Sequence, residues 1–232
     1  MNPVGEAALA SESIVERVRN QGFDSNTYLC ETGESGKCIL IDPGLDFLTI
    51  DAALQRRMLS PVAIFCTHGH FDHLGSVDFF QKKYAAKTYM HVGDSKLSQS
   101  ANFLMMACKV AGPRISVPRF DVLFSDEGAI EVEGSRLPLL YHHTPGHTGG
   151  SCFLEYRGQL FTGDTLYRNA IGLVKLPGED IDQLKGSLLR IWNLLDDSLV
   201  VHPGHGGSDR FGVIKKSNRP LREFLGFTDD GV

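Results

Sequence analysis

Residues 67–75 read Thr-His-Gly-His-Phe-Asp-His-Leu-Gly and bring four metal-binding side chains within six positions. They follow the apolar residues 62–66, which predict a buried strand. Gly69 and Gly75 let the chain turn tightly, so a rigid strand end can direct several imidazoles and a carboxylate to one point. This mixture of ligands suits zinc, iron or manganese. The alternative is a histidine-rich surface loop without a metal, which the potential ligands further along the chain disfavour.

Three later segments also place histidine or aspartate beside glycine. They are His-Thr-Pro-Gly-His-Thr-Gly-Gly at residues 143–150, Phe-Thr-Gly-Asp-Thr-Leu at 161–166 and His-Pro-Gly-His-Gly at 202–206. Together with residues 67–73, and in this order, they resemble the signature of the metallo-β-lactamase superfamily, over about residues 26–205. Among the branches of that superfamily, the chain resembles the glyoxalase II-like (hydroxyacylglutathione hydrolase-like) metallohydrolases most.

The resemblance implies an α/β (α+β) fold, the four-layer αββα sandwich of two mixed sheets with helices outside and a metal site at one edge. Apolar patterning predicts the elements of such a fold. Strands are expected at residues 14–19, 27–31, 38–42, 62–66, 88–90, 129–132, 137–142, 151–156, 159–162 and 198–201, and helices at 48–59, 73–84, 94–110 and from 180. We expect a single domain over residues 1–232, with a frayed segment at 1–12 and a short helical tail at 206–232.

The resemblance also implies a set of seven metal ligands, two of which are the expected catalytic carboxylates. His68, His70 and His147 would hold a first metal, Asp72, His73 and His205 a second, and Asp164 would bridge the two. Asp72 and Asp164 are the catalytic pair. The remaining histidines, His91, His142, His143 and His202, are interpreted as structural or as supporting the ligands. Asp42 has two open interpretations, a turn-forming residue or a support for a ligand.

The charge of this ligand set favours hydrolysis. Two divalent ions, expected to be Zn²⁺ with iron or manganese as alternatives, bring four positive charges, and Asp72, Asp164 and a bridging hydroxide remove three. Such a centre supplies a nucleophile near neutral pH and polarises a carbonyl. No Gly-x-Ser-x-Gly motif offers a serine nucleophile. The sequence therefore predicts a dinuclear metal-dependent hydrolase that uses a metal-bridging hydroxide on a thioester or an activated ester.

Other functions on the same scaffold are less favoured. The best-known metallo-β-lactamases have a cysteine where this chain has Asp164, and flavo-diiron relatives have a glutamate at the position of His70. A mononuclear iron persulfide dioxygenase and a lactonase or other ester hydrolase remain as alternatives. A non-catalytic metal-binding domain is the least favoured, because the ligand set is complete.

Substrate recognition is less defined by the sequence. Relatives that bind glutathione carry Gly-Lys or Gly-Arg where this chain has Gly172 and Leu173, and only 27 residues follow His205. Both departures put glutathione recognition in doubt. Tyr167, Arg168 and Lys175 follow the bridging aspartate and are candidates for contacts with an anionic substrate, with solvated surface residues as the alternative.

A helix over residues 94–110, with Asp94 as its N-cap, is a second candidate for substrate contact. Its apolar run includes Met105 and Met106, which are either core residues or a wall of the substrate pocket.

Composition restricts the partners. The chain has 232 residues, 42% hydrophobic and 22% charged, with a net charge of −5, which argues against a nucleic-acid partner. The sequence contains neither a secretory signal nor a run of apolar residues long enough for a membrane span. The five cysteines form no Cys-x-x-Cys pair, which is typical of reduced thiols in the cytoplasm. We therefore expect a cytoplasmic enzyme with a small-molecule substrate and no membrane partner, of open oligomeric state.

Overall fold

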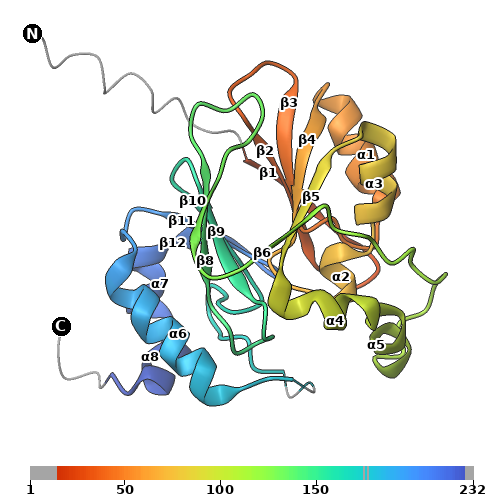
Figure 1. The fold of residues 1–232 in the computed structure, drawn as a ribbon. Coiled ribbons are helices and arrows are strands. Elements are labelled where there is room, and N and C mark those ends of the chain that lie inside the picture. Colours follow the sequence, from red (N-terminus) through yellow and green to blue (C-terminus); the bar gives the residue numbers. More distant parts are fainter. Residues whose placement is uncertain (1–14, 175, 177, 228–232) are drawn as a thin grey trace, which may run out of the picture.

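Two six-stranded sheets lie face to face, with helices on both outer sides (Figure 1). The computed structural model describes residues 15–174, 176 and 178–227. The predicted four-layer sandwich is therefore confirmed. The expected frayed segment at residues 1–12 lies outside the described residues, as do the last residues of the expected tail.

The first sheet has the order β1-β2-β3-β4-β5-β6. Its strands are β1 (Val15–Arg19), β2 (Asn26–Glu31), β3 (Lys37–Ile41), β4 (Ser60–Phe65), β5 (Lys87–His91) and β6 (Val122–Phe124). The first three strands are antiparallel, and β3 to β6 are parallel. Parallel neighbours require crossover connections. These contain α1 (Phe47–Arg56) between β3 and β4, α2 (Phe71–Leu74) and α3 (Val77–Tyr84) between β4 and β5, and α4 (Ser95–Gln99) and α5 (Ala101–Ala107) between β5 and β6.

The second sheet has the order β12-β11-β10-β9-β8-β7. Its strands are β7 (Gly128–Ile130), β8 (Leu139–His143), β9 (Cys152–Tyr156), β10 (Gln159–Gly163), β11 (Val200–Pro203) and β12 (Asp209–Arg210). Only β10 and β11 are parallel. The helix α6 (Ile181–Leu194) connects them, and α7 (Phe211–Ser217) and α8 (Arg219–Leu225) follow. Within the described part of the chain, we find no helix with the length and apolar character that crossing a bilayer requires.

The sheets are buried on both faces because alternate residues of a strand point to opposite sides. In β3, Cys38 and Leu40 pack under the helices, whereas Ile39 and Ile41 pack between the two sheets. The cluster between the sheets also contains large aromatic side chains such as Phe65. This packing holds the strand ends, and the loops that leave them, in fixed positions.

Two helices differ from the sequence prediction. The expected helix at residues 73–84 is divided into α2 and α3 at Gly75 and Ser76. The expected helix at residues 94–110 is a short turn of 3₁₀ helix (Val92–Asp94) followed by α4 (Ser95–Gln99) and α5 (Ala101–Ala107). Asp94 does not cap a helix end with its side chain. The three-residue strand β6 was not predicted, because so short a segment shows no clear alternation.

Candidate metal centre

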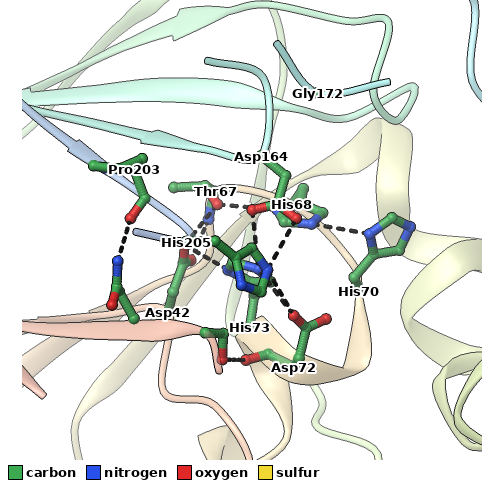
Figure 2. A network of polar contacts seen from close by, with 12 residues as sticks. Asp42, Thr67, His68, His70, Asp72, His73, Asp164, Gly172, Pro203 and His205 are labelled. Atoms are coloured by element: carbon green, nitrogen blue, oxygen red, sulfur yellow. Dashed lines mark hydrogen bonds and ion pairs between the residues drawn. The ribbon is translucent and has the colours of Figure 1, made fainter. Parts of the chain in front are cut away.

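The seven predicted ligands converge at one edge of the sandwich, at loops that follow strands of both sheets. Those of the first motif come from the loop after β4 and from α2, and the others follow β8, β10 and β11. They form two groups in which the ligand atoms lie within 4.8 Å of one another. One group is His68, His70, His147 and Asp164, and the other is Asp72, His73, Asp164 and His205. Asp164 belongs to both, and Figure 2 shows its carboxylate among the imidazoles.

The spacing of the ligand atoms is that of a metal site. In the first group, His70 Nδ1 lies 3.0 Å from His68 Nε2 and 3.1 Å from His147 Nε2. In the second group, His73 Nε2 lies 3.3 Å from Asp72 Oδ2 and 3.3 Å from Asp164 Oδ1. Ligand atoms on one tetrahedral zinc ion, each about 2.0–2.1 Å from it, lie about 3.3 Å apart.

Unsatisfied polar atoms support the same interpretation. Asp72 Oδ2, His73 Nε2 and Asp164 Oδ1 are buried without a hydrogen-bond partner among the described residues. Burying such atoms without a partner is costly, so native proteins rarely leave three together. Metal coordination would satisfy all three. The residues present therefore fit a dinuclear centre.

The outer nitrogens of the ligands are held by hydrogen bonds. The Asp42 carboxylate accepts hydrogen bonds from the backbone N–H of Thr67 (2.7 Å) and from its hydroxyl (2.7 Å), and it lies 3.0 Å from His73 Nδ1. His147 Nδ1 lies 3.1 Å from the carbonyl oxygen of Gly172. Such partners fix the orientation of an imidazole and leave its other nitrogen for the metal. Of the two interpretations of Asp42, the structure supports the one in which it positions a ligand.

Comparison with known proteins agrees with this geometry. The family model described as the metallo-beta-lactamase superfamily matches residues 20–205. The chain belongs to the metallo-β-lactamase superfamily. A hydroxyacylglutathione hydrolase of Anaeromyxobacter dehalogenans is 35% identical over 190 residues, which are 81% of this chain and 63% of that protein. The resemblance to glyoxalase II-like hydrolases is thereby confirmed.

Two solved structures extend the comparison. The crystal structure of BLEG-1 B3 metallo-beta-lactamase matches with a TM-score of 0.81 and 27% identity, over 92% of this chain and 100% of that one. A protein crystallised in a di-iron-bound form matches with a TM-score of 0.73 and 34% identity, over 88% of this chain and 98% of that one. The chain is therefore a metallohydrolase of this superfamily. Its relatives do not establish which metal it binds.

The protonation of the histidine ligands differs between the two ligand groups. Burial lowers the pKa of His68 well below its usual value and lowers the pKa of His70 to about 4. Burial alone would also lower the pKa of His205, but the carboxylates of Asp164 and Asp72, 3.4 Å and 3.3 Å from its Nε2, outweigh burial and raise that pKa to about 10. His68 and His70 are thus neutral imidazoles that can bind a metal directly, whereas a metal that binds His205 displaces a proton.

Asp94 has a role that the sequence did not reveal. Its buried carboxylate accepts hydrogen bonds from the backbone N–H groups of Gly69 (2.7 Å) and Gly150 (2.8 Å) and from the hydroxyl of Thr148 (2.7 Å). It therefore ties the loop of the first motif to the loop that carries His147. The signal was a single aspartate beside an expected helix, for which an N-cap was the ordinary interpretation.

A cavity of about 460 Å³ opens onto the metal groups. Five ligands lie in its wall, together with Phe23, Phe71, Leu104, Cys108, Tyr167, Val174 and Leu176. Among the lining residues that the structure describes there is no lysine or arginine. The walls are thus mainly apolar, and the polar groups are concentrated at the metal centre.

The predicted substrate contacts are only partly brought together. Tyr167 lines the cavity, whereas Arg168 forms an ion pair with Asp209 at 3.0 Å. Met105 is buried in the core and Met106 is 66% exposed, and neither lines this cavity. Lys175 lies outside the described residues.

The four remaining histidines belong to neither metal group. The ring of His91 stacks on that of His143 with centroids 3.9 Å apart. His142 Nε2 lies 3.2 Å from a carboxylate oxygen of Glu155. His202 is held between Ser208 and Gln159. These contacts agree with structural roles.

Proposed function

We propose that this protein is a dinuclear metal-dependent hydrolase of thioesters or activated esters. The observation that carries the proposal is the pair of ligand groups that share Asp164 at the end of an apolar cavity. When bound, two divalent ions would acidify water and polarise a carbonyl. The protein's own part is to hold the seven ligands, to exclude bulk water and to position the substrate.

Tyr167 is the one polar, non-ligand side chain that we assign to substrate positioning. It lines the cavity, and its ring lies 6.2 Å from that of His205. Burial raises the pKa of its phenol well above the usual value, and the nearby negative charge of Asp164 adds to the effect. The phenol therefore stays protonated. Its O–H donates to the Asp164 carboxylate, which places it at the metal centre, where it can turn to donate to a substrate oxygen instead.

The proposed substrate is a small molecule without strong negative charge near the reacting bond. The described cavity wall has no lysine or arginine to pair with an anion, and Leu173 packs against the core under α6. Buried anions need such partners. These features support a thioester or ester with apolar substituents over a glutathione conjugate.

An iron-dependent persulfide dioxygenase is the second candidate. We retain this candidate because a protein 34% identical to this chain was crystallised in a di-iron-bound form. A similar chain can therefore hold iron. The two functions consume different reactants, so a direct assay separates them.

The test begins with metal analysis of the purified protein. The protein is then assayed with an acyl thioester, a lactone, a β-lactam and a persulfide, the last with an oxygen electrode. We expect hydrolysis of the thioester, its loss after chelation and its return after Zn²⁺ is added. Oxygen uptake with the persulfide and no hydrolysis of any ester would instead support the dioxygenase and overturn the proposal.

A further inference from the structure

A second and larger cavity lies beside the metal cavity. Its volume is about 810 Å³, in the range of ligand-binding pockets, whereas a close-packed interior leaves few voids larger than a water molecule. The apolar part of its wall comes from Leu45, Phe47, Phe79, Met105 and Ile115. Its lining residues come from the start of α1, from α3, from α5 and from residues 111–116, and Figure 1 shows α1 and α3 above α5. No metal ligand lines it.

Three segments line both cavities. In the turn between β1 and β2, Gly22 faces the second cavity and Phe23 the metal cavity. In α5, Met105 lines the second cavity and Leu104 the metal cavity. At α2, Phe71 lines the metal cavity, and Gly75 at the end of the helix lines the second. The two cavities are therefore neighbours along these three segments.

Two of these segments meet through aromatic rings that line the metal cavity, those of Phe23 and Phe71. Phe23 packs edge-on against Phe71 with ring centroids 5.0 Å apart. Phe71 is 2% exposed and fixed in the core, whereas Phe23 is 38% exposed on a surface turn. An apolar chain that leaves the metal cavity past Phe23 meets Gly22, the neighbouring residue, which lines the second cavity.

The charges at the second cavity do not favour an anion. Lys82 is already paired with Asp78 at 2.7 Å, and Lys83 with Asp51 at 2.6 Å. Arg114 is exposed, so water surrounds its guanidinium. Because the neighbouring lysines are neutralised and the walls are apolar, an uncharged hydrocarbon chain suits this cavity best.

We infer that the second cavity binds the acyl chain of a substrate whose carbonyl lies at the metal centre. The inference rests on the proposed hydrolase function and narrows its substrate class to thioesters or esters of medium- to long-chain acids. Each methylene that leaves water contributes at most about a fourfold gain in kcat/KM. The preference for long chains is therefore large enough to measure.

The first experiment uses metal-loaded protein and N-acetylcysteamine thioesters with acetyl, butyryl, octanoyl and dodecanoyl chains. We expect kcat/KM to rise at least about tenfold from butyryl to dodecanoyl. Ser116→Trp places a large ring in the second cavity, where Ser116 is exposed and lines the wall. This variant should lower the dodecanoyl-to-acetyl ratio of kcat/KM at least about fivefold. The control Ala107→Trp alters an exposed residue of α5 that lines neither cavity and should leave the ratio unchanged.

A binding experiment separates this inference from the proposed function. Calorimetry of dodecanoate with the metal-loaded wild type, Ser116→Trp and Ala107→Trp needs no turnover. Weaker binding in Ser116→Trp alone supports the acyl site, even if no thioester is hydrolysed. Hydrolysis without chain-length preference, together with equal dodecanoate binding in all three proteins, would overturn the acyl site and leave the hydrolase standing.

Discussion

Replacing Asp94 with alanine tests how the two metal-binding loops are joined. The carboxylate is 1% exposed and accepts three hydrogen bonds, from Gly69, Thr148 and Gly150. A hydrogen bond to a charged group contributes about 1.5–3 kcal/mol. Burial of the charge offsets part of this, as the raised pKa of Asp94 indicates. We expect Asp94→Ala to lower the free energy of unfolding by about 3–5 kcal/mol.

The assay is urea unfolding of wild type and variant, with metal content measured on the same samples. Asp180→Ala is the matched control, because Asp180 also accepts a backbone hydrogen bond, from Gln183, but caps the exposed start of α6. Its loss should cost about 1 kcal/mol and leave metal binding intact. If Asp94→Ala unfolds within about 1 kcal/mol of wild type and keeps its metals, Asp94 does not join the loops in the way described.

Three further predictions follow from the site. Asp42→Ala should weaken metal affinity about 10–100-fold, measured by competition with a chelator, because His73 loses its orienting partner; unchanged affinity would refute that role. A glutathione thioester should show a kcat/KM similar to that of its analogue without the γ-Glu and Gly groups, since Leu173 supplies no cation; a large advantage for the full conjugate would contradict this. The metal-free protein should lose stability as pH rises from about 6.5 to about 10. In that window the raised pKa of His205 lets the folded state bind more protons than the unfolded state. A free energy of unfolding in urea that does not change with pH would exclude this role of His205.

The ligands could be predicted from the sequence because each lies in a short motif with its own turn residues. His68, His70, Asp72 and His73 are local to one loop, so their convergence needs only a strand end and tight glycines. The order of the four motifs then indicated the metallo-β-lactamase sandwich, whose strand ends bring the remaining three ligands to these four. The strands were also predicted well, since most are apolar runs between turn formers.

The parts that failed depend on packing between distant segments. The pattern of apolar residues in α5 could not show which side chain faces which cavity. Leu104 and Cys108, one helical turn apart, line the metal cavity, whereas Met105 lines the second cavity and Met106 is exposed. Asp94 resembled a cap because its partners Thr148 and Gly150 are more than 50 residues away. The contact between Phe23 and Phe71 likewise joins a surface turn to α2.

The most direct test of the dinuclear centre is the metal-to-protein ratio of wild type and Asp164→Ala, measured beside thioester hydrolysis. Asp164 is the only residue of the described chain that belongs to both ligand groups. We predict two metal ions per wild-type chain, and in the variant a lower ratio together with a loss of hydrolysis. Two ions and full activity retained in Asp164→Ala would contradict the shared ligand and the mechanism built on it.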